Sequence, residues 1–157
     1  MAASQSKKEE SGKERAPEIG LGVLLRRANK VFAEAISANL ALYGISHSQF
    51  HHLRRLWEQD GLSSSELSAR VEVKKATSTQ ILEALERRKL IRRVRNDPDR
   101  RRVNVFLTEA GKALEPQLAD CARRANQQAG KYLKDGDRAL LYSLLQKTIA
   151  GLHERSA

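Results

Sequence analysis

The chain has 157 residues, and its 29 lysines and arginines against 19 aspartates and glutamates give a formal net charge of +10. A chain of this length can bury a hydrophobic core without disulfide bonds or a structural metal. A membrane-spanning helix needs about 20 consecutive apolar residues, and no stretch of the sequence approaches that length. The charge predicts a polyanionic partner, either nucleic acid or an anionic membrane surface, and a merely basic soluble protein is the alternative.

The N-terminal part divides into a tail and a helix. Residues 1–17 are rich in Ser, Lys, Glu and Gly with nearly balanced charges, which predicts a disordered tail, and they lack the apolar core of a secretory signal. In residues 18–44 the apolar side chains recur at three- and four-residue steps, as in one long amphipathic helix. Gly44 ends this helix because glycine readily adopts the left-handed conformation.

Two capping boxes mark the next helices. Ser46 with Gln49, and Ser63 with Glu66, have the spacing in which each side chain binds the other residue's backbone N–H. The first box predicts a helix that stops near residue 60, and the second predicts a short helix. A third helix, at about residues 75–89, follows almost at once.

A basic hairpin follows the three helices. Residues 91–95 and 103–107 are short segments with β-branched side chains, and the Asn, Asp and Pro between them favour a turn. Nine basic residues crowd this region: Arg87, Arg88, Lys89, Arg92, Arg93, Arg95, Arg100, Arg101 and Arg102. A solvated charge run explains solubility, but it does not explain why the charge gathers on a hairpin.

The C-terminal part, residues 109–157, is predicted to be helical. One long helix capped by Thr108 is expected to run to about Leu133, with a bend at Pro116 because proline removes a backbone donor. A last amphipathic helix carries leucines up to Leu152.

Residues 45–108 therefore predict a winged helix-turn-helix within a mostly α fold. On the third helix, Ser78, Ile81, Leu82 and Leu85 share the apolar face, and the opposite face is small and polar near its N-terminus. Such a face can read base edges in the major groove, where Gln80 suits adenine and the methyl groups of Ala76 and Thr79 suit thymine. An ordinary surface helix is the alternative. The predicted DNA-binding residues are Ser64, Lys74, Lys75, Ala76, Thr77, Thr79, Gln80, Asp99, Arg100, Arg101 and Arg102.

Several segments resemble the MarR family of bacterial regulators over about residues 20–152. They are Leu67-Ser68-Ala69-Arg70-Val71, the helix from Thr77 to Leu90, and Asp97-Pro98-Asp99-Arg100-Arg101 followed by Leu107-Thr108-Glu109-Ala110-Gly111. The resemblance implies a dimer that binds a pseudo-palindromic operator, usually represses, and often releases DNA on binding a small molecule. By position, it implies that Arg101 enters the minor groove and that Asp99 orients it. The chain departs from the family at Glu72, where glycine is frequent, and at Lys74, where Ser or Asp is frequent.

The first and last helices carry apolar stripes that a winged helix of about 65 residues does not need, so they are expected to form an isologous homodimer. Packing within one subunit is the alternative. The resemblance also implies an effector site between the two lobes for an aromatic carboxylate or phenol, for which the candidates are Arg27, Tyr43, His47, His51 and Trp57. Core packing is the simpler role for Trp57.

Other chemistry finds little support in the sequence. His47 and His51 lack a third nearby ligand, so no metal site is predicted. The single cysteine, Cys121, cannot form an internal disulfide, which fits a cytoplasmic location, and it is expected to be a small core residue. No phosphate loop, activated nucleophile or cofactor motif indicates an enzyme. A non-specific or architectural nucleic-acid binder and a protein–protein module remain the competing functions.

Overall fold

The computed structural model describes residues 19–95 and 102–153. Its elements are α1 (Leu21–Ala41), α2 (His47–Glu58), α3 (Ser64–Arg70), α4 (Lys75–Arg87), β1 (Ile91–Arg95), β2 (Val103–Leu107), α5 (Glu109–Ala113), α6 (Glu115–Ala129) and α7 (Asp137–His153). The predicted tail at 1–17 and the hairpin tip at 96–101 fall outside the described residues.

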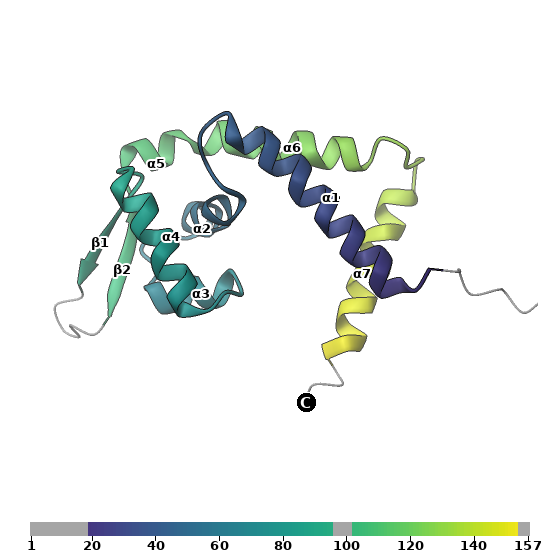
Figure 1. The fold of residues 1–157 in the computed structure, drawn as a ribbon, viewed down its shortest axis with the longest axis horizontal. Coiled ribbons are helices and arrows are strands. Elements are labelled where there is room, and N and C mark those ends of the chain that lie inside the picture. Colours follow the sequence, from purple (N-terminus) through teal and green to yellow (C-terminus); the bar gives the residue numbers. More distant parts are fainter. Residues whose placement is uncertain (1–18, 96–101, 154–157) are drawn as a thin grey trace, which may run out of the picture.

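The elements gather into two lobes (Figure 1). Helices α2, α3 and α4 and the hairpin β1–β2 form the winged-helix lobe, and α1, α6 and α7 form the helical lobe. The strands are antiparallel, with Ile91 opposite Leu107 and Arg95 opposite Val103. Helices α5 and α6 run from the wing to the far end of the molecule, where the chain turns back into α7. The predicted mostly α fold with a small β wing is confirmed.

Both predicted capping boxes are present. The Ser46 hydroxyl accepts from the backbone N–H of Gln49, whose side chain accepts from the N–H of Ser46. The same reciprocal bonds join Ser63 and Glu66 at the start of α3. Each box satisfies two N–H groups that the first helical turn leaves without partners.

Three helices end with the same backbone motif. After α1, α3 and α4, a residue with positive φ reverses the chain: Gly44 (65°), Glu72 (56°) and Lys89 (58°). In each case the next residue donates its N–H back over the last turn, as from Ile45 to the Leu40 carbonyl at 3.2 Å. Glycine takes this conformation without strain, whereas a residue with a Cβ does not.

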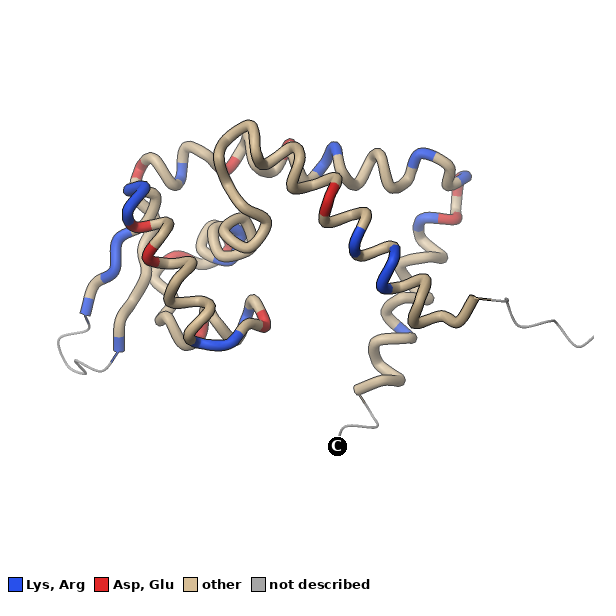
Figure 2. Tube along the Cα trace, in the orientation of Figure 1, with Lys and Arg blue, Asp and Glu red and all other residues tan. Residues whose placement is uncertain are grey.

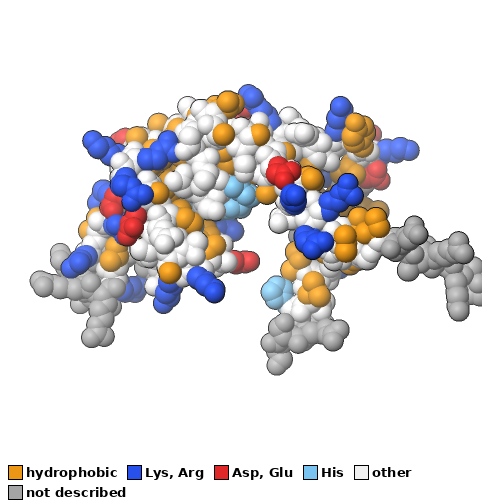
Figure 3. All heavy atoms as spheres, viewed as in Figure 1, with side chains coloured by type: hydrophobic (Ala, Val, Ile, Leu, Met, Phe, Trp, Pro, Cys, Tyr) orange, Lys and Arg blue, Asp and Glu red, His pale blue; other side chains and the backbone are white. Residues whose placement is uncertain are grey.

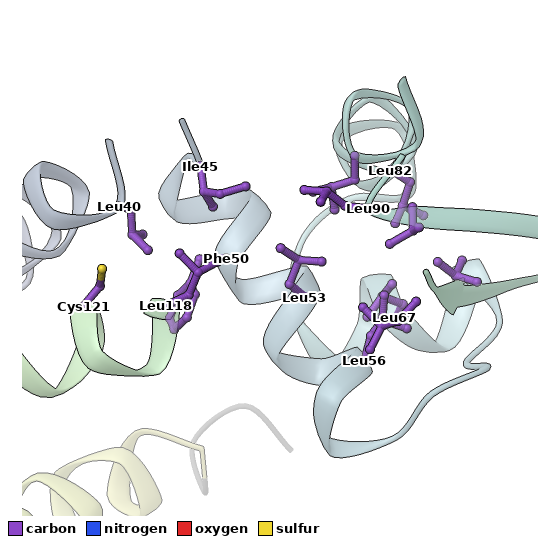
Figure 4. Packing of buried hydrophobic residues seen from close by; sticks show 14 of the residues in the cluster. Leu40, Ile45, Phe50, Leu53, Leu56, Leu67, Leu82, Leu90, Leu118 and Cys121 are labelled. Atoms are coloured by element: carbon purple, nitrogen blue, oxygen red, sulfur yellow. The ribbon is translucent and has the colours of Figure 1, made fainter. Parts of the chain in front are cut away.

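The hydrophobic core runs continuously through the winged-helix lobe into the helical lobe. Figure 4 shows buried side chains that extend from Leu40, Leu118 and Cys121 through Phe50 and Leu53 to Leu56, Leu67, Leu82 and Leu90. Burial of each such side chain contributes about 1.5–3 kcal/mol. Because α2 supplies the middle of this row, it connects the recognition region to the helical lobe.

The helix predicted from Thr108 to about Leu133 is instead two helices. α5 ends at Ala113 and α6 begins at Glu115, with Pro116 in its first turn. Proline cannot donate to the preceding turn but is tolerated at a helix start, so the regular helix is interrupted at Leu114, whose φ of −77° and ψ of −16° remain in the right-handed helical region. The second helix also stops earlier, at Ala129.

Gly111 marks a close approach between α5 and the start of the wing. A Cβ at this position would overlap the carbonyl oxygen of Leu90, and it would also meet Leu107 at 3.2 Å. The residue is buried, so the glycine is needed for packing and not for a special φ.

The helical lobe leaves much apolar surface uncovered. Helix α7 has no buried residue, and α1 buries only Ile36 and Leu40. Large exposed side chains on these helices include Leu21, Leu24, Val31, Leu140, Leu141, Leu144, Ile149 and Leu152. Within the described ranges, no helix is long and apolar enough to pass through a bilayer.

Candidate nucleic-acid interface

Helix α4 has one buried face and one exposed face, as its spacing predicts. Ser78, Leu82 and Leu85 are buried against the lobe. On the opposite side and at the N-terminal end lies an accessible surface, the groove face, which holds six of the predicted DNA-binding positions. Its exposed residues are Lys74, Lys75, Ala76, Thr77, Thr79 and Gln80.

The turn before α4 leaves its first N–H groups free of side-chain caps. Lys74 occupies the N-cap, with extended backbone angles and no side-chain hydrogen bond to the helix. Glu72 holds the left-handed position of the preceding turn, so the chain keeps the turn without the glycine frequent in the family. Uncapped N–H groups beside two lysines form a favourable place for a phosphate oxygen.

The wing is fixed to α4 by a charged contact. The Arg93 side chain donates to Glu86 at 2.8 Å, and the Arg93 backbone N–H donates to the same carboxylate at 3.0 Å. These bonds lower the pKa of Glu86 below its usual range. Neighbouring Arg92 lies over the Phe106 ring at 4.7 Å, so the guanidinium packs on the wing surface.

Positive charge collects along the wing and at both ends of α4 (Figure 2). Arg102 is exposed immediately before β2, with its guanidinium 3.6 Å from Glu66. Asp99, Arg100 and Arg101 lie outside the described residues. The predicted minor-groove role of Arg101 therefore stays a prediction.

Ser64 has a different environment from the other predicted contacts. It is half-buried at the start of α3, and its hydroxyl donates to the Val103 carbonyl at 3.2 Å. In the free protein this side chain therefore joins α3 to the wing strand β2.

One buried polar contact behind the groove face was not predicted. His52 of α2 is 1% exposed, and its Nε2 lies 3.0 Å from the Ser78 hydroxyl on the buried face of α4. Its Nδ1 lies 2.8 Å from the Ser48 carbonyl. Burial lowers the pKa of His52. The signal in the sequence is a serine on an otherwise aliphatic helix face, matched by a histidine among the leucines of α2.

The structure brings together only part of the predicted effector site. His47 and His51 lie one turn apart on α2, with their Nε2 atoms 3.0 Å apart, and burial lowers the pKa of both. Figure 3 shows histidine side chains at the notch between the two lobes. Tyr43 lies in the turn before α2, and its carbonyl accepts from Arg88.

Arg27 and Trp57 lie elsewhere. Arg27 is some four helical turns, or about 20 Å, before the turn into α2. Trp57 packs on the core, with its ring N–H donating to the Gly111 carbonyl at 3.0 Å. The predicted core role of Trp57 is therefore confirmed. With Phe50 and Arg54 it lines a cavity of about 460 Å³ between α2 and α6.

Neither a metal centre nor a reactive thiol emerges from the described part of the chain. In those residues no group of three or more His, Cys, Asp or Glu side chains could hold a metal ion. Cys121 is buried in the core, as predicted, and burial raises the pKa of its thiol, which disfavours the reactive thiolate.

Curated relatives match most of the chain. NicR, an HTH-type transcriptional repressor from Pseudomonas putida, is 32% identical over 82% of this chain and 82% of its own length. TtmR, an HTH-type transcriptional regulator from Methylorubrum extorquens, is 34% identical over 74% of this chain, and the match spans 60% of TtmR.

Solved structures share the fold. BpsR of Bordetella bronchiseptica, whose DNA binding is regulated by 6-hydroxynicotinic acid, superposes with a TM-score of 0.75 at 28% identity, covering 81% of this chain and 96% of BpsR. A MarR mutant from E. coli in complex with operator DNA gives a TM-score of 0.76 at 26% identity, covering 82% of this chain and 92% of that one. The MarR family model matches residues 45–103, which hold α2 to the wing. With the groove face, the wing and these relatives in agreement, the chain belongs to the MarR family of helix-turn-helix transcription regulators.

Proposed function

We propose that this protein is a homodimeric repressor that binds a specific duplex operator through two copies of α4 and the wing, and that a small aromatic acid releases it. The observation that carries the proposal is the groove face, a helix end with small polar side chains and no side-chain cap. Basic residues lie at both ends of α4, and its opposite face is buried against the lobe. That arrangement suits entry into a major groove.

Base recognition is assigned to the middle of the groove face. The exposed Gln80 amide can form two hydrogen bonds with an adenine edge. The Thr79 hydroxyl donates to the Lys75 carbonyl at 2.9 Å, so its methyl group is the part left for a thymine methyl. Lys74 and Lys75 are assigned to phosphates, which fix the register of the helix but carry no sequence information.

A second subunit is the partner proposed for the apolar helical lobe. Helices α1 and α7 expose leucines that no other described element covers. A two-fold dimer buries the same surface twice and places two recognition helices about 34 Å apart, which matches one turn of DNA. A pseudo-palindromic operator follows from that symmetry.

The effector is assigned to the notch between the lobes. Its proposed ligands are His47 and His51, whose pKa values are lowered by burial, so both rings are neutral near pH 7 and can hydrogen-bond a carboxylate or a hydroxyl group. The regulation of BpsR by 6-hydroxynicotinic acid supports an aromatic acid as the class of ligand. Arg27 stays a candidate only for a site that the dimer completes.

The test is operator selection from random and genomic duplexes, followed by affinity measurements on Gln80→Ala. We expect the wild type to prefer its operator by at least about 10³-fold over random duplex. Gln80→Ala relaxes the preference at one base pair per half-site, at a cost of about 1–3 kcal/mol. Gln127→Ala, at an exposed glutamine on α6, is the matched control and leaves the base profile unchanged.

Two further outcomes separate the alternatives. Steep salt dependence without operator preference would indicate a non-specific binder, because phosphate contacts alone give a slope of about −0.9 per neutralised phosphate. Weak salt dependence would indicate a protein–protein module. Addition of 6-hydroxynicotinic acid to the operator complex tests the release, and an unchanged complex at saturating acid argues against this ligand class.

A further inference from the structure

A single polar side-chain contact crosses the buried interface between α2 and the recognition helix α4. His52 and Ser78 are both at most 2% exposed, and their hydrogen bond of 3.0 Å is surrounded by aliphatic side chains such as Leu53 and Leu82. Two aliphatic side chains of similar size could fill the same space without requiring a particular orientation. The His52–Ser78 hydrogen bond therefore fixes the relative position of α2 and α4 in a way that hydrophobic packing alone does not.

The direction of the bond is fixed by its neighbours. The Ser48 carbonyl can only accept, so Nδ1 of His52 carries the ring proton. In the neutral ring, Nε2 then has only a lone pair, and the Ser78 hydroxyl must donate to it. The neutral ring is thus fully satisfied in one tautomer and one hydroxyl orientation.

Ser78 is placed to transmit this constraint to the groove face. It lies between Thr77 and Thr79, and Ala76 and Gln80 project from the opposite side of the same helical turns. A displacement of Ser78 relative to α2 therefore moves each base-reading side chain by a similar amount. Hydrogen bonds to base edges tolerate only a few tenths of an ångström.

We propose that His52 is a positioning residue that fixes the recognition helix for sequence-specific binding, and that protonation of its ring disturbs this position by reversing the contact with Ser78. The inference rests on the proposed function, since it concerns how the operator is read. A charged ring donates from both nitrogens, so the contact must reverse: the Ser78 oxygen accepts from Nε2, and the Ser78 hydroxyl proton has to find another acceptor. Phosphate contacts tolerate the resulting shift better than base contacts do.

No charged side chain among the described residues offsets the cost of protonation. The titratable groups of α2 besides His52 are His47, His51, Arg54, Arg55 and Glu58, and those of α4 are Lys75, Glu83, Glu86 and Arg87, with Lys74 at its N-cap. The other elements packed on α2 carry Arg26, Arg27, Lys30 and Glu34 (α1), Glu66 and Arg70 (α3), and Glu115, Asp120, Arg123 and Arg124 (α6), and β2 carries none. Burial lowers the pKa of His52, and only the Ser48 carbonyl opposes it.

The experiment compares operator and random-duplex affinities of the full-length protein between pH 5.5 and 8. Three variants are needed: Ser78→Ala, which removes the donor; His52→Gln, which keeps an acceptor but cannot titrate; and Ser68→Ala, at an equally buried serine whose hydroxyl binds within α3. Thermal unfolding at each pH reports whether each variant is folded.

At pH 7.5 we expect Ser78→Ala to lower operator affinity about tenfold and to change random-duplex affinity less than about twofold, because a buried acceptor loses its donor. Ser68→Ala matches the wild type. In the wild type the operator preference falls only as the pH drops well below 6.5, because burial lowers the pKa of His52 beneath the ordinary value of histidine. His52→Gln keeps the preference at pH 7.5 and loses this pH dependence, although His47 and His51 still titrate.

The outcomes separate the two proposals. A wild type that selects no operator at pH 7.5 rejects the proposed function and this inference with it. Operator selection with equal effects of Ser78→Ala and Ser68→Ala rejects the positioning role alone. If Ser78→Ala is unfolded, the profile of His52→Gln decides, since a pH dependence equal to that of the wild type overturns the proposal.

Discussion

At the scale of single residues, two charged side chains occupy backbone positions that favour glycine. Glu72 and Lys89 have φ values of 56° and 58°, and each ends a helix of the DNA-reading unit. The left-handed conformation costs a residue with a Cβ about 1 kcal/mol relative to glycine. The unfavourable angle persists because it allows the next residue to bond back to the helix. The N–H of Val73, for example, donates to the Ser68 carbonyl and closes the end of α3.

Glu72→Gly is therefore expected to stabilise the protein by about 1 kcal/mol, because it removes this strain. Unfolding in urea measures the change. Glu72→Ala is the matched control and gives little of the gain, because alanine keeps a Cβ at positive φ. Equal effects of the two variants would show that the carboxylate, and not the backbone, sets the stability.

Residue-level features differed in how far the sequence predicted them. The capping boxes at Ser46 and Ser63 were predictable because their hydrogen bonds span only three residues. The His52–Ser78 contact joins residues 26 positions apart, and only the three-dimensional packing of α2 on α4 reveals it. Of the predicted effector residues, His47 and His51 share a helix face by spacing alone, whereas nothing local relates either to Arg27.

At the scale of elements, the wing packs so closely against α5 that position 111 has no room for a side chain. Thr108 caps α5 through Gly111 and also donates to the Lys89 carbonyl at 2.6 Å. Its N–H donates to the Leu90 carbonyl, which is the group that a Cβ at Gly111 would overlap. The Leu-Thr-x-x-Gly pattern of the sequence thus corresponds to one packed corner.

Gly111→Ala is expected to destabilise the protein by about 2–3 kcal/mol, because backbone on both sides must move to admit the methyl group. Differential scanning calorimetry gives the change. The same substitution at Gly22, an exposed helical glycine where an added Cβ would meet nothing within 4 Å, should instead stabilise by about 0.5–1 kcal/mol. A neutral Gly111→Ala would mean that the corner is loosely packed in solution.

The sequence predicted the two strands correctly, but it did not predict the division between α5 and α6. Both strands agree with the predicted residues, because hairpin pairing follows from two β-branched runs around a turn. The division into α5 and α6 was missed because Pro116 is compatible with either a bent helix or a new one.

At the scale of the whole molecule, the exposed apolar surface of α1 and α7 is the main feature that one chain leaves unexplained. Between α1, α6 and α7 lies a cavity of about 680 Å³, lined by residues such as Phe32, Leu141 and Leu145. The sequence predicted apolar stripes on both helices, but no property of a single chain shows how a second copy covers them. The homodimer therefore belongs to the proposal.

Leu144→Glu, on the exposed side of α7, is expected to weaken dimerisation at least about tenfold, because a charge would be buried at the two-fold interface. Analytical ultracentrifugation measures the dissociation constant. Gln146→Glu places the same charge on an exposed polar position of the same helix and serves as the control. A Leu144→Glu protein that stays dimeric would locate the interface elsewhere.

The break between α5 and α6 has a mechanical consequence. Between α5 and α6 the helix is interrupted at Leu114, and Pro116 has no backbone N–H to donate across this joint. A pivot of about 10° at such a joint shifts a point 20 Å away, roughly the length of α4, by about 3.5 Å. That amplitude equals the rise of one base pair, so in the proposed dimer a small rotation of each subunit would change the match between the two copies of α4 and successive major grooves.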